Sequence, residues 1–521
     1  MSEEKSAEKS SHSPVTLFAR QSTGLVKSVS LLDSIAINVS YMSVGAALAL
    51  IGFTMIALPS VSGVNLVIGS AIAAVLAIPQ MVVYTIMQRR VSRTGGDYVW
   101  LSRSLGAFPG STLTFMGITL ETMPYLALIA LSAVFAIGSV GSFVGYSILS
   151  ALAVPGRAPL LQFVLGSAIV IVLIGINIVR PRAGFRIVSL FWIIGMVATL
   201  VSVLVLFVAG RDGVTGYVNS LQIPNTTYTS IENSYKGSTS FDFGATLLVL
   251  PFFALFSYPW FNAAPSVGSE LKGRKTIRWN APISLLVAFL ILTIPFATMY
   301  YVGGFRFTNE ALANPALVND YSFNFWTLAM GVSNNFLLEL VIGVGWIVFT
   351  LAVLAFGIIT ISRYLLAQAF DRFLPEKIAY VSPKYGSPVL AHTLDLVVTV
   401  ALIGLASFLY GTISSLYGAV AASMIYFAFV GAGAVVYAIY HESVWRTKLT
   451  LMIAGFLQVI VFAFLSYEFF AYPSVWGGNP LAYGYIAATF VAGVAIYAIS
   501  KTFHARKGID ISAAFKEIPP E

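Results

Sequence analysis

The sequence predicts an all-α integral membrane protein with about twelve transmembrane helices. Of its 521 residues, 58% are hydrophobic and only 10% are charged. A typical soluble domain is about 45–50% apolar and about 25% charged. Twelve segments reach the roughly 20 apolar residues that a spanning helix needs. A transmembrane barrel would instead show strands of about ten residues with alternating polarity.

The twelve predicted spans divide evenly between the two halves of the chain. The first six are Leu32–Met55, Gly63–Met87, Gly110–Ile137, Leu160–Val179, Ile187–Ala209 and Gly244–Val267. The second six are Ala281–Val302, Phe336–Leu366, Val389–Leu409, Ile413–Tyr440, Leu449–Leu465 and Leu481–Ser500.

Basic residues between the spans predict the orientation. With the N-terminus placed in the cytoplasm, all but four of the 29 lysines and arginines fall in cytoplasmic segments; the four are Arg157, Arg211, Lys236 and Arg306. The positive-inside rule therefore predicts that both termini are cytoplasmic. This bias also accounts for the net charge of +8 without nucleic acid as a partner. The polar N-terminal residues contain no apolar stretch of the kind found in a cleaved signal peptide.

Composition excludes several kinds of chemistry. The chain has no cysteine, and its four histidines (His12, His392, His441 and His504) are scattered, so we expect no metal site and no cofactor. A membrane-embedded enzyme such as a lipid-modifying transferase would need Asp, His or Arg clustered at one membrane face. The sequence shows no such cluster, and we expect neither catalytic residues nor enzymatic activity.

Two predicted spans are interrupted by residues that disfavour a continuous helix. The first contains a polar, small-residue stretch around Asn38–Ala46, and the sixth contains Pro259 within Phe256–Asn262. Proline removes a backbone donor and clashes with the preceding turn. Each interruption alone fits ordinary helix packing through small residues or a proline kink. Interruptions at matching positions in two repeats of five helices instead point to a transporter binding site.

Three segments carry a more specific signal, one after each of spans 2, 6 and 8. The first is RTGGDYVWL at residues 93–101. The second is SELK at residues 269–272, followed by API at 281–283. The third is SRYLLA at residues 362–367, followed by FDRFLP at 370–375. In order and spacing these segments resemble the inner-loop signatures of the amino acid–polyamine–organocation superfamily of permeases. The resemblance covers roughly residues 25–500.

The resemblance implies a leucine-transporter-type fold: a five-plus-five inverted repeat with broken helices 1 and 6, plus two C-terminal helices. We therefore expect secondary transport of an amino acid or related amine across the plasma membrane by alternating access. The expected organisation is a cytoplasmic tail (1–30), repeat 1 (31–210), an extracellular loop (211–243), repeat 2 (244–440), helices 11 and 12 (441–500) and a second cytoplasmic tail (501–521).

In such a fold, half-helix N-termini face the substrate carboxylate and unwound carbonyls accept from its amine. Carried over by position, the carboxylate would lie at Met42–Ala47, and the amine and an aromatic lid at Tyr258–Asn262. The predicted substrate-binding residues are Ser43, Val44, Gly45, Ala46, Tyr258, Trp260 and Asn262.

The chain departs from the family pattern at both interruptions. The first keeps one glycine of the usual Gly-x-Gly, and the sixth has Trp260 and Asn262 where Gly-x-Glu is usual. A tryptophan at this place predicts a narrower or differently shaped pocket, and the missing acid favours a neutral or apolar amino acid. The fifth span lacks the lysine that replaces a sodium ion in some relatives, so the coupling ion stays open.

Glu121 is the deepest ionisable residue in the predicted spans. An acid inside the membrane is costly, which favours a role in proton coupling or in contact with a cationic substrate. The alternative is a hydrogen-bonded acid that packs between helices. A non-transporting receptor that binds an amino acid on the same fold is the main alternative function. The oligomeric state stays open.

Overall fold

The computed structural model describes residues 27–224, 226–320, 322–409 and 412–517. Within these residues the regular elements are helices, accompanied by two isolated β-bridges. Eleven helices of the described part are long and apolar enough to cross a membrane. The predicted all-α membrane fold is confirmed. The sixth predicted span, Gly244–Val267, is not a continuous helix, which is why eleven rather than twelve are found.

The helices before residue 225 are α1 (Leu31–Tyr41), α2 (Val44–Ala57), α3 (Leu66–Leu76), α4 (Ile78–Arg90), α5 (Asp97–Ser104), α6 (Ala107–Thr114), α7 (Thr122–Phe143), α8 (Pro159–Val179) and α9 (Pro181–Ser220). Those after it are α10 (Tyr228–Ser234), α11 (Phe243–Leu248), α12 (Leu250–Phe256), α13 (Ala263–Ser266), α14 (Gly273–Gly303), α15 (Phe305–Leu312), α16 (Phe325–Ser333), α17 (Phe336–Phe370), α18 (Val389–Phe408), α19 (Thr412–Ala419), α20 (Ala421–His441), α21 (Trp445–Ala471), α22 (Pro473–Trp476) and α23 (Pro480–Ala505).

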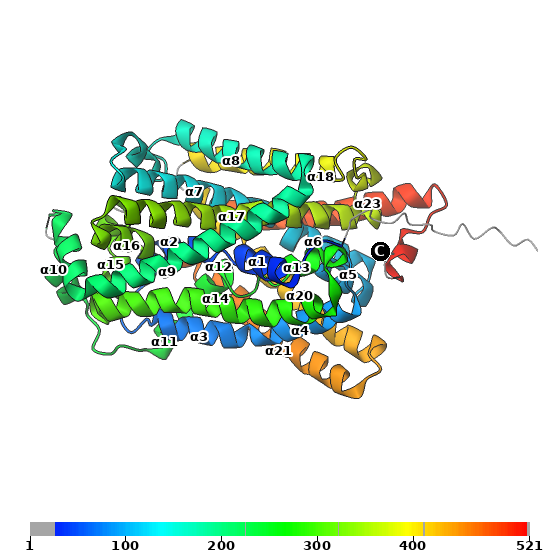
Figure 1. The fold of residues 1–521 in the computed structure, drawn as a ribbon. Coiled ribbons are helices and arrows are strands. Elements are labelled where there is room, and N and C mark those ends of the chain that lie inside the picture. The colour runs from blue at the N-terminus through cyan, green and yellow to red at the C-terminus, as the bar shows by residue number, and fades with distance from the viewer. Residues whose placement is uncertain (1–26, 225, 321, 410–411, 518–521) are drawn as a thin grey trace, which may run out of the picture.

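The long helices run alongside one another and give the molecule two ends (Figure 1). One end carries α5, α6 and the C-terminal part of the chain, and we call it the basic end after Arg103, which belongs to α5. The other end carries α10, α15 and α16. The positive-inside rule predicts that the basic end is cytoplasmic.

The broken first span lies in the middle of the bundle. In α1–α2, in α6–α7 and in α17, 78% of the apolar window is buried by the protein itself, against 22% in α23. A helix that is apolar on all sides must be buried in the protein or face lipid. The core therefore consists of α1–α2, α7 and α17, with α8, α9, α18, α21 and α23 towards the outside.

The predicted loop at 211–243 is partly helical. Helix α9 continues to Ser220 beyond a bend at Gly210, whose backbone is non-helical (φ 59°, ψ −161°). Thr227 then starts α10, because its side chain accepts from the amide of Ser230. These two helical segments could not be predicted from hydropathy, because a polar surface helix, unlike a spanning helix, has no long apolar run. The boundaries of the two repeats stay a prediction.

Candidate functional site

The first span is broken between α1 and α2. Ser43 has a left-handed backbone (φ 44°, ψ 37°), which ends α1 and redirects the chain into α2. Side chains other than glycine seldom adopt this conformation, and it clusters at functional sites. The first amides of α2, starting at Val44, have no acceptor within their own helix. The break therefore presents a helix N-terminus inside the protein, the kind of group that attracts an anion.

The sixth span is broken between α12 and α13. Helix α12 ends at Phe256, and the amides of Ser257 and Tyr258 both donate to the Phe253 carbonyl at 3.0 Å. Pro259 follows, and its carbonyl accepts from Gln80 Nε2 at 2.9 Å. The helix resumes only for the single turn Ala263–Ser266. The interruption predicted from Pro259 is present.

The two breaks contact each other directly. Ser43 Oγ donates to the Phe256 carbonyl at 2.9 Å and lies in a short hydrogen bond with the Tyr125 hydroxyl of α7. On the other side, the Ala264 amide donates to Asn38 Oδ1 at 2.9 Å. Side chains of the first-span break therefore form hydrogen bonds with backbone groups on both sides of the sixth-span break.

Trp260 fills the space beside the breaks. Its ring stacks on Tyr125 at 5.4 Å between centroids and meets the edges of Tyr41 and Phe427 at 5.4 and 5.7 Å. Its Nε1 donates to the Leu255 carbonyl at 2.8 Å. The side chain is completely buried. The ring therefore lies against the Ser43–Tyr125 side of the contact between the breaks.

Three of the predicted first-span residues are packed into the core. Val44 and Ala46 are fully buried. The Gly45 carbonyl oxygen accepts a hydrogen bond from Trp326 Nε1 at 3.0 Å. A Cβ placed on Gly45 would lie 3.0 Å from Phe349 Cβ, so only glycine fits without a shift. The close approach explains the one glycine that this stretch retains.

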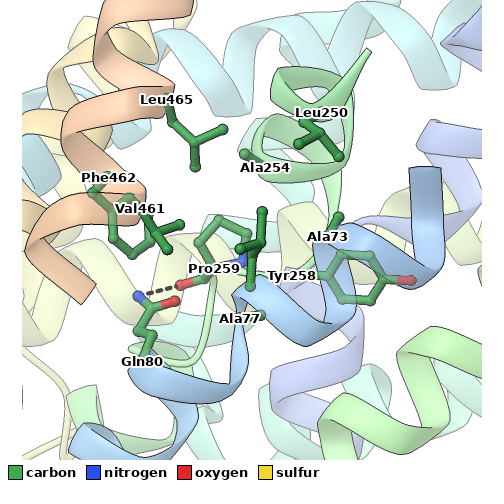
Figure 2. A pocket seen from close by; sticks show the side chains of 11 residues that line it. Ala73, Ala77, Gln80, Leu250, Ala254, Tyr258, Pro259, Val461, Phe462 and Leu465 are labelled. Atoms are coloured by element: carbon green, nitrogen blue, oxygen red, sulfur yellow. Dashed lines mark hydrogen bonds between the residues drawn. The ribbon is translucent and has the colours of Figure 1, made fainter. Parts of the chain in front are cut away.

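Tyr258 is directed towards α3. Its hydroxyl lies 2.6 Å from Ser70 Oγ of α3. Together with Pro259 and Gln80 it lines a cavity of about 30 Å³ between α3–α4, α12 and α21 (Figure 2). That volume holds about one water molecule. The structure thus places Trp260 at the contact between the breaks, and Tyr258 on their far side.

Asn262 lies at the basic side of the sixth-span break. Its Nδ2 donates to the Tyr364 hydroxyl of α17 at 3.2 Å, and its Oδ1 has no partner among the described residues. Sequence reasoning missed both Tyr364 and Tyr125. Tyr125 follows Glu121 by four residues on one helix face, which is the only local signal that links it to a polar site.

Glu121 is completely buried beside the site. Ser423 Oγ of α20 donates to its Oε2 at 2.5 Å, whereas Oε1 has no partner in the described part of the chain. Glu121 follows a π-helical stretch, Phe115–Leu120, a distortion that is frequent at functional sites. The next residue, Thr122, contacts the Tyr41 hydroxyl at 3.2 Å. The acid is therefore one residue from the wall of the candidate site.

The three signature segments meet in one layer at the basic end, which we call the closed layer. Arg363 Nε donates to Glu270 Oε1 at 2.8 Å, and both side chains are at most 5% exposed. Arg103 pairs with Asp371, with Nη2 at 2.8 Å from Oδ1. The Gly95 amide donates to the Ser266 carbonyl at 2.9 Å. These contacts hold the three segments together at the basic end, next to α13.

A cavity of about 280 Å³ lies towards the other end of the molecule. Its lining includes Phe53 and Thr54 of α2, Ser132 of α7 and Tyr417 of α19. The Tyr417 hydroxyl lies 3.0 Å from Thr54 Oγ1, and its ring is 5.6 Å from that of Phe256. Tyr417 and Phe256 thus separate this cavity from the breaks.

The described residues contain no cluster of His, Cys, Asp and Glu that could hold a metal ion. The sequence model of the amino acid permease family matches residues 29–496. A stretch of 101 residues is 32% identical to a protein named "Uncharacterized protein 399" from Sulfolobus islandicus rod-shaped virus 1, and covers 19% of this chain. The chain spans about a quarter of that relative's length (24%), so the likeness carries no functional argument.

Proposed function

This chain belongs to the amino acid permease family, and we propose that it is a secondary active transporter that moves a neutral or apolar amino acid across the plasma membrane by alternating access. The family and the eleven long apolar helices of the described part make it a multi-pass membrane transporter. The observation that supports the finer proposal is the direct contact between two broken helices, from Ser43 to Phe256, in the middle of the bundle.

The breaks offer complementary groups for the two ends of an amino acid. The first-turn amides of α2, at Val44, Gly45 and Ala46, suit a carboxylate because they have no acceptor within their own helix and lie at the positive end of the helix dipole. Carbonyls of the sixth-span break, which include that of Phe256, suit an ammonium group. Ser43 and Asn262 add neutral polar contacts, and Trp260 covers the site.

The surroundings of the breaks favour an uncharged substrate side chain. Trp260 is enclosed by Tyr41, Tyr125 and Phe427. The buried acid Glu121 is hydrogen-bonded to Ser423 of α20. A charged side chain placed against these rings would lose its hydration without gaining an ion pair, which is costly.

The two ends of the molecule support alternating access. Buried ion pairs close the basic end, whereas the cavity of about 280 Å³ approaches the breaks from the other end and stops at Tyr417 and Phe256. We assign this arrangement to a state that is closed towards the cytoplasm. Substrate release there requires the closed layer to separate.

Gly45→Leu tests the site assignment. The added side chain would collide with Phe349, because even a Cβ would lie 3.0 Å from it. We expect uptake by the purified protein in liposomes to fall at least about tenfold, which corresponds to about 1.4 kcal/mol. Gly175→Leu on α8 is the matched control, because no atom lies within 4 Å of its added Cβ. Unchanged uptake by the Gly45→Leu variant would remove α2 from the site.

Glu121→Gln tests proton coupling, the second part of the proposal. A buried acid with one unpartnered oxygen is suited to bind and release a proton, and glutamine keeps its shape without that capacity. We expect an inward proton gradient to stimulate uptake by the native protein and not by the variant, with exchange retained. Glu468→Gln on α21 is the control, since Glu468 is also buried in a span. Equal stimulation of both variants would contradict the assignment.

A further inference from the structure

A second acid, Asp97, is buried at the basic end. It starts α5 after Gly95 and Gly96, and positive φ angles there (86° and 43°) turn the chain inward. A Cβ on Gly95 would lie 2.4 Å from Ala367 Cβ, so the turn requires glycine. Asp97 is completely buried and forms no ion pair with any described residue. Nothing in the transport cycle proposed above uses it.

Tyrosine hydroxyls from separate helices surround the Asp97 carboxylate. Tyr84 of α4 donates to Oδ2 at 2.5 Å, and Tyr364 of α17 donates to Oδ1 in a short hydrogen bond. Tyr426 of α20 also interacts with the carboxylate, and its hydroxyl is near Thr114 as well. Asp97 therefore ties together three helices that belong to different parts of the sequence.

Tyr364 connects this carboxylate to the candidate site. Its hydroxyl accepts from Asn262 Nδ2 at 3.2 Å while it donates to Asp97. The preceding residue, Arg363, forms the buried ion pair with Glu270. One turn of α17 thus contacts the sixth-span break, the Asp97 carboxylate and the closed layer. Tyr364 and its neighbour Arg363 thus join these three places.

We propose that Asp97 is a positioning residue that couples the sixth-span break to the closed layer, and that loss of its proton favours opening of the basic end. The inference rests on the transport function proposed above, because it assigns the layer to the release step. Asp97 acts through Tyr364 and Asn262 and does not itself touch the substrate. The proton that leaves Asp97 passes to water on the side that opens.

The direction of the effect follows from burial. Desolvation raises the pKa of Asp97 from its ordinary 3.8 to about 6, although the hydroxyls of Tyr364, Tyr84 and Tyr426 and the Tyr98 amide oppose this shift. Tyr41 of α1 also lies within electrostatic range of Asp97. The other charged groups of the layer are the pairs Arg363–Glu270 and Arg103–Asp371.

Opening admits water to the carboxylate and returns its pKa towards 3.8. The closed state therefore binds the proton more tightly, and acid stabilises the closed state. As the pH rises through about 6, closure requires a buried, unpaired charge, so the equilibrium moves towards the open state. With a pKa of about 6 in the closed state and near 3.8 in the open state, the ratio of closed to open protein falls about tenfold between pH 5 and pH 7.

Cysteine labelling tests this inference without any substrate. Because the chain contains no cysteine, Ser269→Cys places a single thiol in the closed layer, where Ser269 is 5% exposed. Labelling of the purified protein by a maleimide is measured from pH 5 to pH 7. Each rate is divided by that of Ser220→Cys, an exposed position, to remove the intrinsic pH dependence of the thiol. We expect a relative increase of about tenfold with a midpoint near pH 6.

In the same background, Asp97→Asn is expected to abolish the pH dependence, and the exposed Asp212→Asn to leave it unchanged. Tyr364→Phe removes a hydroxyl that stabilises the charged form, so the midpoint is expected to move above 6. It also provides a second variant if Asp97→Asn fails to fold. A pH response that persists in Asp97→Asn, or a midpoint unmoved by Tyr364→Phe, would overturn the inference. Absence of amino-acid flux in the native protein would overturn the transport proposal instead, since labelling does not depend on flux.

Discussion

Replacing Trp260 with leucine is expected to abolish most substrate uptake. Trp260 stacks on Tyr125, contacts Tyr41 and Phe427 edge-on, and donates to the Leu255 carbonyl at 2.8 Å. Leucine leaves that carbonyl unpaired and the aromatic wall incomplete. Truncation of a buried aromatic residue to alanine typically costs about 3–5 kcal/mol of folding stability, and an unpaired buried polar group adds about 1–3 kcal/mol. Even part of this loss, if confined to the bound state, lowers uptake more than tenfold.

The uptake rate is measured in liposomes and divided by the amount of protein that remains monodisperse and folded. Trp445→Leu at the start of α21 is the matched control, because that side chain is 69% exposed. It is expected to transport at the native rate. If Trp260→Leu transports as well as Trp445→Leu, the ring does not cover the site, and the assignment of the sixth-span break to substrate is wrong.

Glu270→Gln is expected to destabilise the closed layer by about 3–5 kcal/mol, the usual result of leaving one buried charge without its partner. Arg363 would then remain buried, since it is 3% exposed, with its guanidinium facing a neutral amide. The layer should separate to hydrate it. We expect a lower melting temperature and faster labelling of Ser269→Cys at every pH between 5 and 7.

A double variant distinguishes the effect of an unpaired charge from the effect of losing the ion pair as a whole. Replacement of both partners by apolar residues, as in Glu270→Leu with Arg363→Met, is expected to recover much of the lost stability, because buried pairs exchanged for apolar groups are often neutral overall. Glu232→Gln is the control: its partner Arg211 is 57% exposed, and such surface pairs contribute about 0–1 kcal/mol. A Glu270→Gln variant as stable as Glu232→Gln would show that the pair does not hold the layer.

The positions of the helices and of both breaks could be predicted from the sequence. Apolar length identified the spans, and Pro259 identified the break that splits the sixth span into α12 and α13. Such features are local: they depend on residues within a turn or two. The end of α9 at Ser220 was missed because a polar helix gives no hydropathy signal.

The orientation of side chains inside the breaks could not be predicted. Outside a regular helix or strand, side-chain directions do not repeat with a fixed period, so the sequence does not predict them. Tyr258 and Trp260 are two residues apart, yet the structure turns Tyr258 towards Ser70 and Trp260 towards Tyr125. The backbone is already non-helical at Ser257 (φ −142°, ψ −89°), so no helical period relates these two side chains.

The hydrogen bonds between distant segments of the bundle could not be predicted either. Asp97 and Tyr364 are 267 residues apart, and Ser43 and Phe256 are 213 apart. Each of these contacts depends on the packing of helices that no local pattern specifies. The sequence analysis identified the three signature segments by their resemblance to the inner loops of permeases, but only the structure shows that they meet in one layer.

The central claim is that the chain transports an amino acid, and radiolabelled uptake by the purified protein in liposomes tests it most directly. A panel of neutral, acidic and basic amino acids is offered with and without an inward proton gradient. We predict saturable uptake of a neutral or apolar amino acid, stimulated by the gradient. Binding of an amino acid without flux under any gradient would contradict the claim and identify a receptor on the same fold.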